Sequence, residues 1–205
     1  MCSSDLAALL AGLPVRALSS SLEATHPLRG TQVPHRRCEA GQQWRWDGVE
    51  FTVLHPRAQD YERPASKPNA MSCVLRVADA HGRSLLLTGD IEAEQELRLV
   101  SSGDAALRST VLMVPHHGSK TSSTPAFIAA VAPEVALVQA GYRNRFGHPA
   151  SAVTARYAEQ GVVLLRTDAC GAWTWHSDMA PVDPLHCERR AGARYWHHRA
   201  GGGER

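Results

Sequence analysis

The stretch Ser109–Ser123, STVLMVPHHGSKTSS, constrains the fold more than any other part of this sequence. Val111–Val114 is a short apolar run with β-branched ends, which is typical of a buried strand. Pro115 ends the strand because proline has no backbone N–H to donate to a neighbouring strand. Two histidines, a glycine and several hydroxyl side chains around Lys120 follow at once. The pattern predicts a buried strand that delivers polar side chains to the edge of a sheet. The alternative is a polar surface loop with two solvated histidines.

The composition suits one globular domain with tails. The 205 residues are 43% hydrophobic with a net charge of +2, which allows a core and neither favours nor excludes a nucleic-acid partner. No apolar run reaches the roughly 18 residues that a membrane-spanning helix needs, and the first residues lack the basic segment of a signal peptide. The five cysteines have no CxxC spacing, so we expect mostly buried thiols. A disulfide involving Cys38 is the alternative in an oxidising compartment.

Apolar patterns predict a layered α/β or α+β fold with helices covering a sheet. Asp47-Gly48 between two alternating runs predicts a hairpin of Gln43–Trp46 and Val49–Leu54. A helix over Leu6–Leu13 and a short strand over Val15–Leu18 precede it. The later strands are expected at Met71–Ala78, Ser84–Leu87, Val111–Val114, Val135–Gln139, Val162–Leu165 and Ala172–Trp175. The helices between them are expected at Ile91–Val100, Ser122–Val131 and Ser151–Gln160. Residues 177–205 show no periodicity, so we expect a domain over 1–176 followed by a disordered tail.

Three predicted strands are followed by groups that bind metals or transfer protons. Ser84–Leu87 leads to Asp90, the central strand leads to His116 and His117, and the next strand leads to His148. If these strands are parallel neighbours, their side chains converge on one edge, where open α/β sheets keep their sites. A carboxylate and imidazoles suit Zn, Mn or Fe. Taken singly, Asp90 can be a helix cap and His148 a plain loop histidine.

A second set of residues suits an anion such as phosphate. Ser119 and Lys120 lie among hydroxyls that lead into a predicted helix N-terminus. Arg143 and Arg145 lie in the predicted loop Gly141–Pro149 and can contact a phosphate backbone. A solvated capping loop and a solvated basic loop are the respective alternatives.

Three motifs in this order, LLLTGDIEAE, VPHHGSKTSST and AGYRNRFGHP, are preceded by WRWDGVEFTVLHP and NAMSCVLRV. Together they resemble the C-terminal metallo-β-lactamase-like domain of ComEC, the DNA-internalisation protein of natural competence. The resemblance runs from about Cys38 to Trp175. It implies an αβ/βα sandwich, present here in part, with a dinuclear metal site at one edge that holds two divalent ions, Mn or Zn.

The resemblance implies Asp90 as a metal ligand and leaves open whether His148 or the His116–His117 pair supplies the next one. We assign Asp90, His116 and His148 as the metal set and Asp90 with His117 as the catalytic pair. Ser119, Lys120, Arg143 and Arg145 are the phosphate-binding set. The family's H-x-[HD]-x-D-H motif is absent from this sequence, so the resemblance implies the latter part of a domain with an incomplete active site.

The implied function is metal-dependent phosphodiester hydrolysis of incoming DNA, with DNA and the membrane channel of the same full-length protein as partners. No small-molecule organic cofactor is expected. The implied location is the periplasmic face of the inner membrane, with this part itself soluble. A non-catalytic DNA-guiding module and a stand-alone hydrolase of the same fold are the alternatives.

Overall fold

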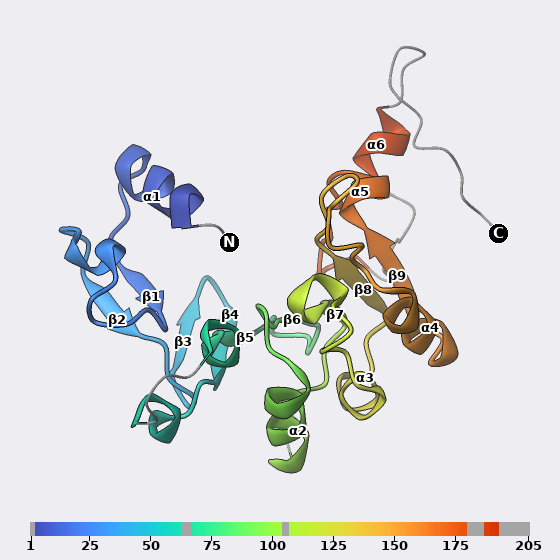
Figure 1. Ribbon diagram of the computed structural model, residues 1–205, viewed down its shortest axis with the longest axis horizontal. Coiled ribbons are helices and arrows are strands. Elements are labelled where there is room, and N and C mark those ends of the chain that lie inside the picture. The colour runs from blue at the N-terminus through green and yellow to red at the C-terminus, as the bar shows by residue number, and fades with distance from the viewer. Residues whose placement is uncertain (1–2, 63–66, 104–106, 180–186, 193–205) are drawn as a thin grey trace.

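The structure is a computed structural model that describes residues 3–62, 67–103, 107–179 and 187–192. Its centre is a seven-stranded mixed sheet in the order β3-β4-β5-β6-β7-β8-β9, and a two-stranded parallel sheet of β1 and β2 lies beside it. Figure 1 shows the large sheet crossing the molecule from β3 to β9, with α1 and the small sheet at the N-terminal side. The mixed α/β sheet expected from the sequence is confirmed.

The strands are β1 (Leu18–Ser20), β2 (His35–Arg37), β3 (Gln43–Trp46), β4 (Val49–His55), β5 (Val74–Ala78), β6 (Ser84–Leu87), β7 (Val111–Met113), β8 (Val135–Val138) and β9 (Val163–Arg166). The α-helices are α1 (Ser3–Gly12), α2 (Ala93–Ser101), α3 (Pro125–Val131), α4 (Ser151–Glu159), α5 (Thr167–Cys170) and α6 (Glu188–Ala191). The short 3₁₀ turns are η1 (Pro27–Gly30), η2 (Ala58–Glu62), η3 (Pro68–Met71) and η5 (Pro115–Gly118). No helix among these described elements is long and apolar enough to cross a membrane.

In the large sheet, neighbouring strands joined without an α-helix are antiparallel, and strands joined through an α-helix are parallel. β3 to β6 form antiparallel pairs, and the β3–β4 turn uses Asp47 and Gly48 at positive φ, 48° and 79°. These backbone angles suit the turn that matches the twist of a hairpin. β6 to β9 are parallel, and α2, α3 and α4 make the crossovers that parallel neighbours need. The ends of β6, β7 and β8 therefore meet at one edge of the sheet.

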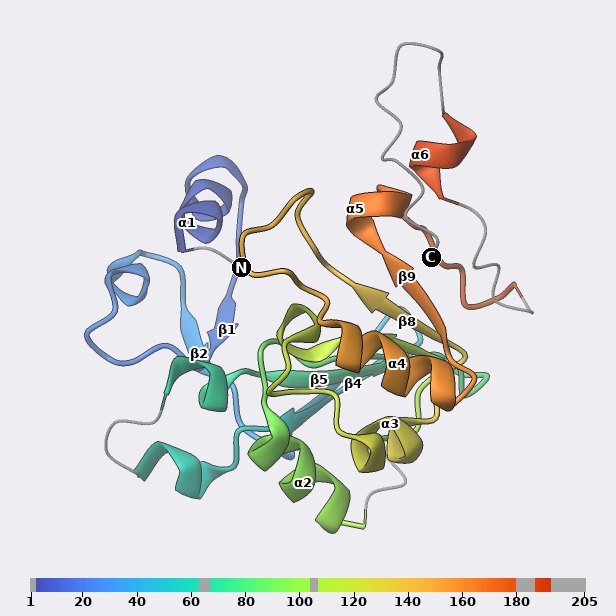
Figure 2. The ribbon, with the colours of Figure 1, turned by 45° about the vertical axis from the view of Figure 1, so that its right-hand side comes forward.

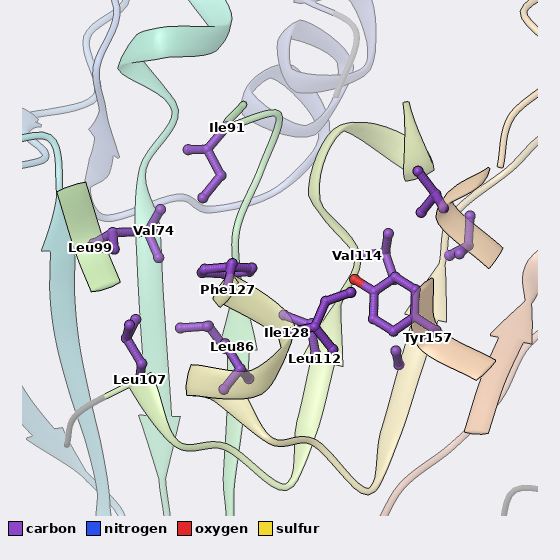
Figure 3. Packing of buried hydrophobic residues seen from close by; sticks show 14 of the residues in the cluster. Val74, Leu86, Ile91, Leu99, Leu107, Leu112, Val114, Phe127, Ile128 and Tyr157 are labelled. Atoms are coloured by element: carbon purple, nitrogen blue, oxygen red, sulfur yellow. The ribbon is translucent and has the colours of Figure 1, made fainter. Parts of the chain in front are cut away.

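One face of the sheet is the main hydrophobic core. Leu86, Leu112 and Ala136 are aligned across β6, β7 and β8, and all three are fully buried. Figure 2 shows α2, α3 and α4 along this side, and Figure 3 shows Phe127 and Tyr157 packed over the strands. Burying a large apolar side chain contributes about 1.5–3 kcal/mol, so this layer holds the site-bearing edge in place.

The opposite face of the sheet is apolar but only partly covered. Leu75 is aligned with Leu87, and Met113 is aligned with Leu137, which in turn is aligned with Leu165. All five side chains are half-buried rather than buried. Parallel strands are apolar on both faces because both faces are normally covered, so this surface is unusual for such a sheet.

Several predicted elements differ from the observed ones. The predicted strand Val15–Leu18 is wrong, because β1 begins only at Leu18. The predicted strand Met71–Ala78 is shortened, since its first residue belongs to η3. The helix predicted from Ser122 begins at Pro125 after the cap Thr124. The predicted strand Ala172–Trp175 is wrong: Trp173 makes an isolated bridge with Cys187 and no strand forms there.

Four of the cysteines form disulfides, so the expectation of buried thiols is wrong for them. Cys38 is bonded to Cys73, and Cys170 is bonded to Cys187. The second bond attaches the short α6 region to α5. Most of the predicted disordered tail, residues 180–186 and 193–205, lies outside the described residues.

Candidate functional site

The three motifs that follow β6, β7 and β8 lie against one another at one edge of the sheet. The backbone N–H of His116 donates to the carbonyl of Gly89 at 3.0 Å, which joins the turn η5 to the loop after β6. The N–H of Ala150 donates to the carbonyl of Gly118 at 2.9 Å, which joins η5 to the loop that carries His148. These backbone hydrogen bonds bring together Asp90, His116, His117 and His148, as the topology predicted.

The turn η5 separates its two histidines. His116 and His117 both have positive φ, 48° and 55°, a conformation that costs roughly 1–2 kcal/mol for a residue with a Cβ. Because of this kink the two imidazoles reach different partners. His117 faces Asp90, and its Nε2 lies 3.5 Å from Oδ1 of that carboxylate. His116 faces Glu92, with its Nδ1 3.3 Å from Oε1 of that carboxylate.

The His117–Asp90 pair has an unusual arrangement of acceptors. Nδ1 of His117 lies 2.9 Å from the carbonyl oxygen of Gln139, which can only accept, so Nδ1 carries the ring proton. In the neutral ring, Nε2 then directs a lone pair toward the Asp90 carboxylate 3.5 Å away. Two acceptors that face each other need a shared proton or cation between them. This geometry suits the pair to binding a proton or a cation.

His116, in contrast, has a partner for each ring nitrogen. Its Nε2 lies 3.3 Å from the amide nitrogen of Asn69, which can only donate, so Nδ1 carries the proton and points to Glu92 and to the hydroxyl of Thr121. Thr121 in turn donates to Glu92 at 3.0 Å. In this arrangement His116 is held in a hydrogen-bond network and has no free lone pair for a metal.

His148 lies next to the other histidines in surroundings that disfavour its charged form. Its ring is 6.2 Å from that of His116 between centroids. Burial lowers the pKa of His148, and the nearby charges of His116 and His117 lower it further. In the described part of the chain its buried Nδ1 has no hydrogen-bond partner. A neutral imidazole with an unpaired nitrogen is the form in which histidine binds metals.

The donor chemistry at Asp90 and His117 fits a shared proton or a cation, but these side chains do not make a complete metal site. Across the described ranges, no group of three or more His, Cys, Asp or Glu side chains is placed to hold one ion. Zn needs about four ligands and Mg-like or Mn-like ions about six, part of them water. The predicted set of Asp90, His116 and His148 is therefore gathered at one edge without converging on a single point.

The loop predicted to bind phosphate is arranged differently from the expectation. Ser119 is buried, and its hydroxyl lies 3.2 Å from that of Thr121, whereas Lys120 is exposed. The backbone N–H groups of Ser123 and Thr124, which precede α3, both donate to the carboxylate of Glu96. The position at this helix N-terminus where a phosphate was expected is thus taken by the Glu96 carboxyl group. Burial raises the pKa of Glu96.

The loop 141–149 carries the two predicted arginines on a framework built by Asn144. The Asn144 amide donates to the carbonyls of Gly141 and His148, at 3.3 Å and 2.7 Å, and its side-chain oxygen accepts from the N–H of His148 at 2.9 Å. Arg143 and Arg145 are exposed on either side of this anchor. The loop therefore presents two cations beside His148.

Sequence reasoning missed four residues that shape this edge. Asn69 and Glu92 hold His116, Glu96 caps the segment after the histidines, and the hydroxyl of Ser72 accepts from the backbone N–H of Asp90 at 3.1 Å. Asn69 and Ser72 belong to the motif NAMSCVLRV, and Glu92 belongs to TGDIE. For these three residues the available signal was their position within the motifs; Glu96 lies outside the motifs, and its sequence position gave no signal.

No protein-family model matches the chain. Among curated proteins, it is 47% identical over 137 residues to competence protein ComA of Neisseria gonorrhoeae, which covers 67% of this chain and 19% of that protein. It is 39% identical over 123 residues to ComE operon protein 3 of Bacillus subtilis, which covers 60% of this chain and 15% of that protein. The chain thus spans about a fifth or less of the length of these relatives.

Among solved structures, the chain aligns with one from Thermotoga maritima that is assigned as a Zn-dependent hydrolase of the metallo-β-lactamase superfamily. The alignment has a TM-score of 0.39 at 12% identity and covers 74% of this chain and 82% of that one. This structural similarity is too weak to support any conclusion beyond the topology described above. The sequence matches are far stronger. Over part of their length, the ComEC family of competence proteins is homologous to this chain.

Proposed function

We propose that this chain is the part of a DNA-uptake protein that handles the phosphodiester backbone, and that Asp90 and His117 take part in its hydrolysis. The observation that carries the proposal is the pair of facing acceptors, Asp90 Oδ1 and His117 Nε2, 3.5 Å apart. The names of the relatives, which are competence proteins, support DNA as the substrate. Arg143, Arg145 and Lys120 supply positive charge at the same edge.

The chain's own residues suit the proton transfers of this reaction. In phosphodiester hydrolysis a water oxygen attacks phosphorus, the P–O bond to the leaving oxygen breaks, and that oxygen takes a proton. His117 can carry this proton on Nε2, where the negative charge of Asp90 stabilises the imidazolium. The carbonyl of Gln139 fixes the ring by accepting from Nδ1.

Metal dependence is part of the proposal. Asp90 is the residue that would hold a divalent ion such as Mn or Zn, with Nδ1 of His148, unpaired among the residues described, beside it, while Nε2 of His117 is left for the proton. When bound, such an ion polarises the phosphate and activates water. Other ligands would be supplied by water or by further protein residues, because the described residues provide only this incomplete set.

Location at an oxidising cell surface is also part of the proposal. Disulfides persist mainly in oxidising compartments such as the periplasm, and the two bonds Cys38–Cys73 and Cys170–Cys187 agree with that setting. The channel of a longer membrane protein is the proposed partner on this face.

The experiment compares Asp90→Asn and His117→Ala with Asp47→Asn. Asp47 lies in the exposed β3–β4 turn at the opposite end of the sheet, where asparagine suits the backbone equally well. We expect Asp90→Asn to lose Mn²⁺ binding, followed by electron paramagnetic resonance. Mn²⁺-dependent cleavage of labelled single-stranded DNA should be lost in both Asp90→Asn and His117→Ala, and Asp47→Asn should keep both properties. Unchanged cleavage in Asp90→Asn would reject the hydrolytic role.

A DNA-guiding module without catalysis is the second candidate. The exposed cationic loop 141–149 and the absence of a three-ligand cluster in the described ranges favour it. DNA binding by wild type, with no cleavage at any Mn²⁺ concentration, would select this candidate.

A further inference from the structure

The loop 141–149 has a second property that the proposed function does not use: its arginines alternate with aromatic side chains. The sequence Tyr142-Arg143-Asn144-Arg145-Phe146 exposes 48% of Tyr142 and 67% of Phe146. A surface phenylalanine that is two-thirds exposed contributes little to folding. Its place beside the candidate site and among arginines therefore suggests a role in binding.

Phe146 continues the row of rings at the sheet edge. Its ring lies nearly parallel to that of His148, with an interplanar angle of 18° and 5.8 Å between centroids. His148 in turn lies 6.2 Å from His116. Asn144 anchors the backbone of the loop, so the exposed ring has a defined position relative to Asp90 and His117.

The arginines of the loop contact the aromatic rings. The guanidinium of Arg145 lies 4.8 Å from the centroid of Phe146, and that of Arg143 lies 5.2 Å from the centroid of Tyr142. An exposed cation–π contact is weaker than the stacking of a nucleobase on an aromatic ring. A base can therefore replace the guanidinium of Arg145, which is then free to contact a neighbouring phosphate.

We propose that Phe146 is a stacking platform for an unpaired base of single-stranded DNA, with Arg143 and Arg145 on the flanking phosphates. This inference rests on the proposed function and adds the side chain that holds a single strand at the site. A base in a duplex is already stacked and has no exposed face, whereas every base of a single strand has one, so stacking selects single strands without reading sequence. The stacked base would hold the adjoining phosphodiester toward Asp90 and His117.

The test measures binding of a fluorescent oligothymidine and of a duplex of equal length by anisotropy, in EDTA so that no cleavage occurs. Phe146→Ala is compared with Phe146→Trp and with Trp46→Ala. Trp46 is a matched control because it is 69% exposed and lies at the β3–β4 turn, the opposite end of the sheet from the site. All variants are checked for wild-type unfolding curves.

We expect Phe146→Ala to weaken single-strand binding about tenfold and duplex binding less than twofold. Phe146→Trp should bind within twofold of wild type, as should Trp46→Ala. Arg143→Ala and Arg145→Ala should each reduce the salt dependence of single-strand binding, by about 0.7 in the log–log slope. Equal single-strand binding by wild type and Phe146→Ala, or an equal loss for duplex, overturns the inference alone. If wild type binds neither DNA, the proposed function fails as well.

Discussion

Gly118 lies so close to Pro149 that a methyl group on its Cα would come within 2.6 Å of the proline Cβ and 3.1 Å of its Cα. The same glycine accepts a hydrogen bond from Ala150 through its carbonyl. This contact holds the turn with His116 and His117 against the loop with His148. The meeting of these motifs thus depends on one residue without a side chain.

Gly118→Ala should be strongly destabilising. Gly118 has a φ of +78°, which costs an alanine roughly 1–2 kcal/mol, and the clash with Pro149 adds to that cost. Gly161→Ala is the matched control, because Gly161 has a φ of +69° but nothing within 4 Å of an added Cβ. In urea unfolding we expect Gly118→Ala to lose at least about 2 kcal/mol more than Gly161→Ala. Equal losses would show that the Gly118–Pro149 contact is not close in solution.

Stability should fall in mild acid because of His55. This side chain is 2% exposed, and its Nε2 donates to the carbonyl of Ala70 at 2.8 Å, next to Asn69 of the site. Burial lowers the pKa of His55 below 6.5, although the Ala70 hydrogen bond and Asp60 oppose the shift. The unfolded chain therefore binds the proton first. The contribution to stability is complete above pH 6.5 and is lost as the pH falls below it.

The measurement is the free energy of unfolding at several pH values between about 5 and 8 for wild type and His55→Gln. Glutamine can still donate to Ala70 but does not titrate. We expect wild type to lose up to about 1.4 kcal/mol per pH unit more than the variant on acidification. Parallel curves would mean that His55 titrates normally in the folded protein.

Each disulfide should contribute separately to stability. Cys38–Cys73 closes a loop with a sequence separation of 35, and Cys170–Cys187 one of 17. Loop-closure entropy predicts about 3–4 kcal/mol for each, slightly more for the longer loop. The double variants Cys38→Ser/Cys73→Ser and Cys170→Ser/Cys187→Ser are compared in urea unfolding, with and without reductant. Reductant should destabilise wild type and each double variant, which keeps one bond; no response in wild type would show that the thiols are free.

The convergence at the sheet edge could be predicted because it follows from topology. Val111–Val114 and Val135–Val138 are continuous apolar runs. Neighbouring parallel strands end at one edge of a sheet, so Asp90 and His117 were expected to lie close together. The β3–β4 hairpin could be predicted from the local turn residues Asp47-Gly48 alone.

Partners that are distant in sequence could not be predicted. From the sequence, Glu96 is expected to be a solvent-exposed residue of a helix. In the structure it is fully buried and accepts hydrogen bonds from the backbone N–H groups of Ser123 and Thr124. Cysteine spacing alone does not determine pairing, so Cys170–Cys187 was not foreseen. The alternating pattern of Ala172–Trp175 suggested a strand, but the only ladder partner of this segment in the described residues is Cys187.

The partly covered face of the sheet yields a final prediction, that the chain self-associates. Leu87 lies on the half-buried apolar face with Leu75, whereas its neighbour Leu86 is fully buried in the helix-covered core. Alternation in a strand thus places two leucines in opposite environments. Apolar sheet surface that is only partly covered favours association, so Leu87→Lys should raise the monomer fraction in sedimentation at little cost in stability. Leu86→Lys should unfold the protein, because it buries an unpaired charge. If both variants unfold alike, the second face is as tightly covered in solution as the first, and the chain's association must have another source.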